Sequence, residues 1–187
     1  MSDDDYIDTQ GFRANVGIIL MRDDGRLFLG GRAGARGWQF PQGGIRRGEP
    51  AEEALYRELE EEIGLAAGDV EQVGRTRGWL RYHLPLQFQR RNANPVCVGQ
   101  KQRWFLLRLV SPESRLRFDA TDQPAEFDRW RWAEYWDPVR EVIYFKRRVY
   151  ARALEELGGY AFPDGLPPYP DWWAERMSRR IRPRQDA

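Results

Sequence analysis

Thiol and imidazole chemistry is almost absent from this chain of 187 residues, which holds one cysteine and one histidine. A lone cysteine excludes an intramolecular disulfide framework, and no Cys/His cluster has the spacing of a zinc site. Lysine occurs only at 101 and 146, so the other 28 of the 30 basic residues are arginines. The formal net charge is +1. Bulk charge therefore cannot attract a DNA duplex, and nucleic acid would have to bind a local patch.

Long apolar runs are also missing. No stretch approaches the ~20 apolar residues of a membrane span, and the acidic start M-S-D-D-D-Y lacks the apolar segment of a signal peptide. We therefore expect a cytoplasmic protein without a membrane partner. Hydrophobic residues make up 41% and aromatic residues 13% of the chain, which favours a folded globule.

The pattern of elements predicts an α+β domain. Strands are expected at 14–21, 26–30, 70–76, 79–84, 103–110 and 129–132, a loop at 31–48, and long helices at 51–63 and 138–157. Strands interrupted by only two long helices indicate a mixed sheet between helices. We expect this domain to cover residues 1–157. The proline-rich segment 158–187, with a short basic helix at 171–181, is either part of the domain or a loosely held tail.

The most informative segment is 43–65, G-G-I-R-R-G-E-P-A-E-E-A-L-Y-R-E-L-E-E-E-I-G-L. Pro50 suits a first helical position, residues 51–63 are mostly good helix formers, and Gly64 is placed to end the helix in a left-handed cap. At about 100° per residue, one apolar stripe forms and should face the core. Its members are Ala51, Leu55, Leu59 and Ile63.

Two kinds of glutamate share this helix. Glu62 falls inside the apolar stripe, Glu58 lies roughly 60° to one side of Leu55, and Glu61 lies roughly 120° away. Carboxylates turned toward a core repel one another and need compensating cations. Mg²⁺ or Mn²⁺ meets that need, because both prefer carboxylate oxygens and also bind substrate phosphates. A merely solubilising acidic face explains Glu53 and Glu60 but leaves Glu58 and Glu62 unexplained.

The same spacing resembles the signature of the Nudix hydrolase family, G-x5-E-x7-R-E-U-x-E-E-x-G-U, in which U is a bulky apolar residue. Every specified position matches, namely Gly43, Glu49, Arg57, Glu58, Leu59, Glu61, Glu62, Gly64 and Leu65. The resemblance implies an α/β/α Nudix fold and hydrolysis of a nucleoside diphosphate linked to another moiety. It also implies Mg²⁺ or Mn²⁺ held by Glu58, Glu61 and Glu62.

Three further signature positions have roles implied by the resemblance. Gly43 would offer a backbone carbonyl to the metal, while Glu49 and Arg57 would orient the loop and helix rather than touch the substrate.

Flanking blocks over roughly residues 10–157 narrow the substrate. They include G-F-R-A-N-V-G at 11–17, W-Q-F-P-Q-G-G-I at 38–45, P-V-C-V-G-Q-K-Q-R-W-F-L-L at 95–107 and F-K-R-R-V-Y at 145–150. They are similar to Nudix enzymes that convert the 5′-triphosphate or 5′-diphosphate end of RNA to a monophosphate. Close relatives instead split dinucleoside polyphosphates and share W-Q-F-P-Q-G-G.

Several residues of these blocks are candidates for substrate binding. Donors around a polyphosphate and the first nucleotides are expected from Arg13, Arg32, Gln100, Lys101 and Lys146, because phosphate contacts dominate affinity. Tyr82 and Phe145 are candidates to stack a base, as in recognition of single-stranded RNA.

Glu126 is the acid that we add to the helix trio, since the corresponding family position completes the metal site or activates the water. An alanine at 125 shifts the local spacing by one residue, so Asp128 is the alternative. Glu58, Glu61 or Glu126 can accept the proton of the attacking water, and the sequence does not choose among them.

Three functions stay open at this point: RNA 5′ pyrophosphohydrolase, dinucleoside polyphosphate hydrolase, and a non-catalytic nucleotide-binding domain. Retention of Arg57, Glu58, Glu61 and Glu62 weighs against the third. The sequence identifies no protein partner.

Overall fold

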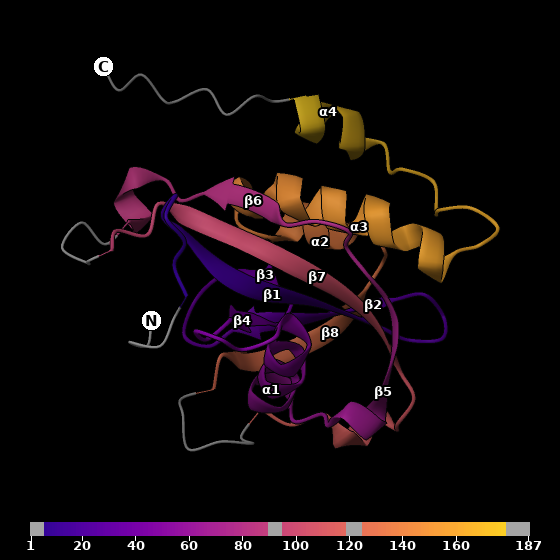
Figure 1. The fold of residues 1–187 in the computed structure, drawn as a ribbon. Helices are drawn as coiled ribbons and strands as arrows, with labels where there is room; N and C mark the ends of the chain where they lie inside the picture. The colour runs from indigo at the N-terminus through magenta and orange to yellow at the C-terminus, as the bar shows by residue number, and fades with distance from the viewer. Residues whose placement is uncertain (1–5, 90–94, 119–124, 179–187) are drawn as a thin grey trace.

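A computed structural model describes residues 6–89, 95–118 and 125–178 (Figure 1). Its strands are β1 Phe12–Met21, β2 Leu27–Arg32, β3 Trp38–Gln39, β4 Gln42–Gly44, β5 Val70–Arg75, β6 Leu80–His83, β7 Gly99–Leu109 and β8 Phe127–Ala133. Its α-helices are α1 Ala51–Ile63, α2 Asp137–Glu141, α3 Arg147–Ala161 and α4 Trp172–Ser178. Short 3₁₀ turns are η1 Ala67–Asp69, η2 Leu86–Phe88, η3 Glu113–Arg115 and η4 Tyr144–Lys146.

The strands form one mixed sheet. β1 pairs in parallel with β7 along its whole length, and the other pairings are antiparallel. The second edge of β7 is shared by β6 and β5, while β2 joins β1 to β3 and β8. α1 covers one face and the layer of α2, α3 and α4 covers the other (Figure 1). The expected α+β fold with a mixed sheet between helices is confirmed.

Burial on both faces explains the long apolar run of β1. Its even-numbered side chains pack with α1, whereas Ile19 and Met21 pack on the α3 side. Gly17 is the exception, because a Cβ atom there would lie 2.6 Å from the ring of Trp104, which is fully buried on the α3 side. The absence of a side chain thus allows Trp104 to pack directly against β1.

The helix expected at 51–63 has those bounds. Gly64 adopts φ 70°, and its N–H donates to the Glu60 carbonyl, which ends the helix in the left-handed cap. The buried apolar residues are Ala54, Leu55, Leu59 and Ile63.

The single helix expected at 138–157 is wrong. α2 closes when the Val142 N–H donates to the Pro138 carbonyl, and Val142 and Ile143 then adopt extended backbone with ψ 155° and 139°. Two adjacent β-branched residues favour such a break. η4 follows, so Phe145 and Lys146 lie immediately before α3. The loop expected at 31–48 likewise contains two short strands, β3 and β4.

The C-terminal segment packs on the body as far as residue 178. The Trp136 indole N–H donates to the Pro167 carbonyl at 2.9 Å, and the ring of Tyr169 stacks on Trp136 at 4.7 Å. Trp173 lies against both rings. The predicted boundary after 157 falls inside α3, and the predicted helix at 171–181 corresponds to α4, with 179–181 outside the described residues.

Within the described residues, no helix has the length and apolar character needed to cross a membrane.

Candidate active site

Arg57 ties the loop before α1 to the helix. Its guanidinium donates to both oxygens of Glu49, at 2.8 and 3.0 Å, and to the Gly44 carbonyl at 2.8 Å. The bidentate geometry suits a planar guanidinium. Arg57 lowers the pKa of the Glu49 carboxyl, and Glu49 also accepts the Arg46 backbone N–H at 2.8 Å. These contacts give Glu49 and Arg57 a position in which they hold the loop.

Glu58 fits beneath the backbone of β4. It is 8% exposed, and a Cβ atom at Gly43 would overlap its carboxylate. Burial raises the pKa of Glu58, and the Arg57 guanidinium, which donates to it at 2.6 Å, opposes that shift. Glycine at 43 is therefore needed for the helix carboxylate to reach the loop backbone.

Glu62 is bound to the same loop. It accepts the Gln42 backbone N–H at 3.0 Å. Burial raises the pKa of Glu62 well above its ordinary value, and the charges of Glu58 and Glu126 act in the same direction. The expectation that Glu62 would lie on the core side of α1 therefore agrees with its surroundings.

Glu61 differs from these two. It is exposed, accepts the Arg57 Nη1 at 3.2 Å, and lies 3.6 Å from Arg46 Nη2. In the described part of the chain, no three acidic, histidine or cysteine side chains stand close enough together to hold an ion as they are. Glu61 would have to leave its arginine partners to join a shared ion.

Glu126 immediately precedes β8, so it reaches the carboxylates of α1 from a different part of the chain. Its Oε1 accepts the Gln39 amide at 3.0 Å and lies 3.4 Å from Arg32 Nε. Asp128, the alternative acid, instead accepts the Gly34 N–H and pairs with Arg129 at 2.6 Å. Because the Glu126 charge acts on Glu62, Glu126 is the acid that faces the helix carboxylates.

Lys146 faces this acidic group. It is 8% exposed, and burial lowers its pKa to about 8, assisted by the nearby Arg32 charge and opposed by Glu62 and Glu126. Its Nζ lies 5.9 Å from the centre of the Tyr82 ring. The break between α2 and α3 brings Lys146 to this position. The charges of Glu58, Glu62 and Glu126 and those of Arg32 and Lys146 therefore act on one another in one group, which we call the active site.

Arg13 and Gln100 belong to the same side. They are register partners in the β1–β7 pair, and burial raises the pKa of both Glu58 and Tyr82 while the Arg13 charge opposes the two shifts. Gln100 Oε1 accepts the Tyr82 hydroxyl at 2.6 Å.

The stacking role expected of Tyr82 does not fit its position. Its side chain is 6% exposed and packs against Phe145 with ring centres 5.8 Å apart. A base cannot reach either face of the buried ring in this conformation. Phe145 is half-buried rather than buried, so of the two it is the candidate that a base can contact.

Lys101 was expected beside the substrate and is instead on the other face of the sheet. Successive side chains of a strand point to opposite faces of the sheet, so Gln100 and Gln102 lie on the face of the active site and Lys101 does not. Lys101 is 8% exposed and pairs with Asp8 at 2.8 Å. The prediction failed because the sequence did not reveal which alternate residues of β7 face α3.

The sequence did not predict a group of hydrogen-bonded amide side chains beside the active site. The Gln102 amide donates to Asn15 Oδ1 at 2.9 Å and to Gln42 Oε1 at 3.3 Å, and Gln39 binds Glu126. A partial signal was present, since Asn15 directly precedes the apolar run of β1, whereas Gln102 lies among other polar residues at the start of β7. Buried amides of this kind need partners, and here they hold the loop that carries Gly43.

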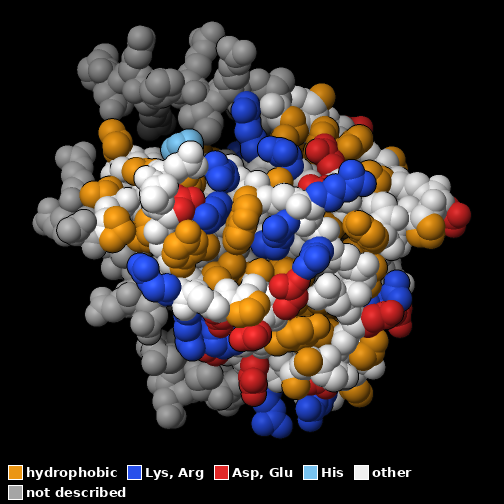
Figure 2. All heavy atoms as spheres, viewed as in Figure 1, with side chains coloured by type: hydrophobic (Ala, Val, Ile, Leu, Met, Phe, Trp, Pro, Cys, Tyr) orange, Lys and Arg blue, Asp and Glu red, His pale blue; other side chains and the backbone are white. Residues whose placement is uncertain are grey.

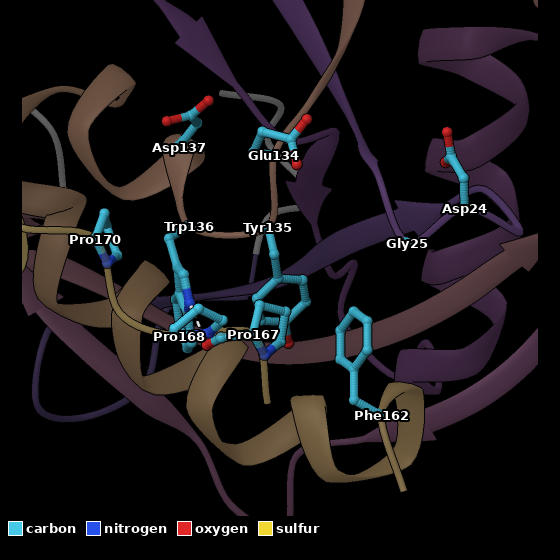
Figure 3. Close-up of a pocket in the computed structure, with 10 residues that line it drawn as sticks. All are labelled: Asp24, Gly25, Glu134, Tyr135, Trp136, Asp137, Phe162, Pro167, Pro168 and Pro170. Carbon is cyan, nitrogen blue, oxygen red and sulfur yellow. Dashed lines mark hydrogen bonds between the residues drawn. The ribbon is translucent and has the colours of Figure 1, made fainter. Parts of the chain in front are cut away.

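A cavity of about 300 Å³ lies elsewhere and takes no part in this arrangement (Figure 3). It opens between Tyr135, Trp136, Phe162 and prolines of the C-terminal segment. Ala133 at the end of β8 precedes it, whereas Glu126 immediately precedes the other end of that strand. Its carboxylates are already paired with arginines: Asp24 with Arg22 and Arg26, Glu134 with Arg26, and Asp137 with Arg140.

Comparison with known proteins decides the family. The NUDIX domain profile matches residues 11–157. The chain belongs to the Nudix family. It is 59% identical over 172 residues to the RNA pyrophosphohydrolase of Alkalilimnicola ehrlichii, with 92% of this chain and 94% of the relative covered. It is 58% identical over 161 residues to that of Thioalkalivibrio sulfidiphilus, with 86% and 92% covered.

Solved structures share the Nudix fold at lower identity. The dihydroneopterin triphosphate pyrophosphohydrolase of E. coli superposes with a TM-score of 0.58 at 18% identity, covering 74% of this chain and 92% of that one. A C. elegans Ap4A hydrolase gives 0.57 at 17% identity, covering 80% and 98%. These likenesses describe the fold alone.

Nudix hydrolases generally need divalent cations. The donor set fits such an ion, because Glu58 and Glu62 are carboxylates whose burial disfavours their charged form in the absence of a cation. The Nudix helix and its loop therefore combine oxygen donors with facing cations from β1, β2 and η4.

Proposed function

We propose that this Nudix enzyme converts the 5′-triphosphate or 5′-diphosphate end of RNA to a 5′-monophosphate. The observation that carries the proposal is the 59% identity to an RNA pyrophosphohydrolase over 92% of this chain. The charges of the active site support it, since Glu62 and Glu126 interact with Lys146, and Arg32 acts on Lys146 as well, so cations that can bind phosphate lie beside the acidic group. A cytoplasmic location stays a prediction.

Binding of the phosphate chain would rest on cations of three elements. Arg13 of β1, Arg32 of β2 and Lys146 of η4 approach the carboxylates from the side opposite α1. Phosphate contacts fix the position of a nucleic acid without reading its sequence. Phe145, beside Lys146, would contact the first bases.

Mg²⁺, or Mn²⁺ in its place, would be held by Glu58, Glu61, Glu62 and Glu126 with the Gly43 carbonyl, and when bound it neutralises phosphate charge and acidifies water. The chain's own contribution is positional. Arg57 and Gly43 fix Glu58, and Gln42 fixes Glu62, so the carboxylates meet the substrate in one orientation.

Hydrolysis breaks a phosphoric anhydride bond of the 5′ end. Water supplies the oxygen, the leaving group is pyrophosphate or orthophosphate, and a carboxylate accepts the proton. Glu58, Glu61 and Glu126 are the candidate acceptors. Lys146 and Arg32 would stabilise the charge that develops on the phosphate oxygens.

The test is a comparison of substrates with Mg²⁺ present. Turnover of triphosphorylated and diphosphorylated RNA is measured beside that of diadenosine tetraphosphate. We expect RNA monophosphate with release of pyrophosphate or orthophosphate. Negligible RNA turnover beside efficient dinucleotide cleavage would eliminate the proposal in favour of a dinucleoside polyphosphate hydrolase.

A matched pair of variants on α1 tests catalysis itself. Glu62→Gln removes a charge bound to the loop, whereas Glu60→Gln removes one from the exposed face of the same helix. Loss of turnover only in Glu62→Gln supports an enzyme. Unchanged hydrolysis in Glu62→Gln would count against the proposed site.

A further inference from the structure

A second concave surface lies on the α1 side of the sheet. It is a cavity of about 240 Å³ that the active-site carboxylates do not line. We call it the Trp79 pocket, and its walls include Tyr6, Trp79, Arg46 and Arg47. A cavity of this size takes a small planar group rather than a whole substrate.

Two aromatic rings form walls of the Trp79 pocket and stay open to solvent. Tyr6 is 38% exposed and Trp79 is 36% exposed. The buried Lys101 Nζ lies 5.0 Å from the Tyr6 ring and 5.2 Å from the Trp79 ring. Cation–π contacts of this kind hold both rings in place.

Arg103 fixes the loop that carries Trp79. Its guanidinium lies 5.2 Å from the Trp79 ring, and its Nη1 donates to the Thr76 and Arg77 carbonyls at 3.0 and 2.7 Å. This loop joins β5 and β6 on the free edge of the sheet. The exposed face of the indole is therefore built into the fold.

The charge around the pocket is positive. Asp8 is paired with Lys101, and Glu49 is paired with Arg57. Among the described residues, no carboxylate lies within salt-bridge distance of Arg47, and Arg46 has only its 3.6 Å contact with Glu61. Figure 2 shows lysine and arginine side chains interspersed with hydrophobic ones over β5, β6 and β7.

We propose that the Trp79 pocket binds a nucleotide unit of single-stranded RNA, with the base against Tyr6 and Trp79 and the phosphates on Arg46 and Arg47. Exposed aromatic rings with adjacent guanidinium groups are the means by which proteins hold single strands without reading their sequence. The proposal rests on the proposed function only in identifying that RNA as the body of the substrate.

The pocket adjoins the active site through two of its lining residues, Arg46 and Glu49, the second of which binds Arg57. Arg46 lines the pocket, and its guanidinium approaches Glu61 of the carboxylate group. By contrast, the candidate substrate-binding residues Arg13, Gln100 and Lys146 lie on the α3 side of the sheet. In the proposed mode the 5′ end is held at the active site and the chain continues past Arg46 to Trp79, so the pocket takes a nucleotide downstream of the 5′ end that the shortest substrates lack.

Binding is tested with a 5′-hydroxyl RNA of twelve nucleotides, which has no 5′ phosphate to hydrolyse. Fluorescence anisotropy gives the dissociation constant for the wild type, Trp79→Ala, Trp79→Phe and Arg47→Glu. We expect the alanine and glutamate variants to bind about tenfold more weakly and the phenylalanine variant to retain most affinity. Arg152→Glu is the matched control, because Arg152 is exposed on α3 and the change in net charge is the same.

A second measurement uses hydrolysis of triphosphorylated RNAs of two to twelve nucleotides. kcat/KM should rise with RNA length in the wild type and in Arg152→Glu, and should not change with length in Trp79→Ala. On the triphosphorylated RNA of two nucleotides, kcat/KM should be the same for all three proteins. Thermal melting establishes that each variant is folded.

Equal affinity of all folded variants for the 5′-hydroxyl RNA would overturn the proposal. The proposal would also be overturned if AMP displaced that RNA at concentrations close to the RNA's own dissociation constant, because the pocket would then be a site for free nucleotides. Failure of the proposed function has a different signature, namely no hydrolysis of any triphosphorylated RNA while Trp79-dependent binding of the 5′-hydroxyl RNA persists.

Discussion

The Glu58 carboxylate lies against the backbone of Gly43, in the space that the Cβ atom of any larger residue at position 43 would need. That carboxylate is the far end of a flexible side chain, so a larger residue at 43 can displace it without disturbing the core. Structure and activity should therefore separate at this position.

Gly43→Ala is expected to fold with a free energy of unfolding within about 1 kcal/mol of the wild type, because only a rotamer must change. Its kcat should fall by about 100-fold, because small displacements of a catalytic group are costly. Chemical denaturation and steady-state hydrolysis measure the two effects. Gly159→Ala is the control, since a Cβ atom at 159 meets nothing within 4 Å. Near-normal kcat in Gly43→Ala would contradict the role given to this contact.

Arg57→Lys should lower kcat/KM by about ten- to 100-fold, because an ammonium cannot replace a bidentate guanidinium and the loop would lose its fixed position. Arg75→Lys is the matched control. Arg75 also pairs with a glutamate, Glu52, but both side chains are exposed, so the change should be nearly neutral. Hydrolysis rates and melting temperatures of both variants provide the comparison, and equal effects would show that Arg57 has no special part.

Lys146→Met should increase stability and reduce activity. The folded pKa of Lys146 is about 8, below its ordinary value of 10.5, so burial of the charged amine costs about 3 kcal/mol wherever it is protonated in both states. That cost is complete below pH 8. Between pH 8 and 10.5 the unfolded chain binds more protons, so wild-type stability rises with pH and the advantage of methionine disappears.

Denaturation of the metal-free protein at pH 7, 9 and 10.5 follows this difference. The exposed Arg148→Met serves as the control for loss of one charge. A Lys146→Met variant that is less stable at pH 7, or a difference that grows with pH, would show that the amine is not a buried cost.

Trp173→Ala should lower the free energy of unfolding by about 1–3 kcal/mol while leaving hydrolysis of a short RNA unchanged. Trp173 joins the tail to Trp136 and Tyr169, and each aromatic pair contributes about 1 kcal/mol beyond its buried area. The cluster is separate from the carboxylates. Val110→Ala, at a 57% exposed position, is the neutral reference for denaturation. Loss of activity in folded Trp173→Ala would instead show that the active site depends on the packing of the C-terminal segment.

Local signals in the sequence predicted α1 and its cap well. The apolar stripe and Gly64 act within one helix, and the structure has the predicted bounds of 51–63. Pro50 stands at the N-cap with extended backbone rather than at the first helical position, and Ala51 at the start of the stripe is only partly buried. The position of Glu62 on the core side followed from helical spacing alone.

Long-range pairing could not be predicted in the same way. Lys101 was expected beside the substrate because it is a cation in the block 95–107 that resembles the family, but the face of each residue depends on how β7 packs between α1 and α3. The break at Val142 was missed because apolar spacing continues across it. The contact of Glu126 with Gln39 depends on the pairing of β2 with both β3 and β8, which no short segment encodes.

Carboxylates of α1 are proposed to hold a divalent ion beside the phosphate chain. Titration with Mn²⁺, followed by electron paramagnetic resonance of the free ion, measures this binding in wild type, Glu62→Gln and Glu60→Gln. We expect at least about tenfold weaker Mn²⁺ binding in Glu62→Gln and unchanged binding in Glu60→Gln. Equal Mn²⁺ binding by the wild type and folded Glu62→Gln would contradict it.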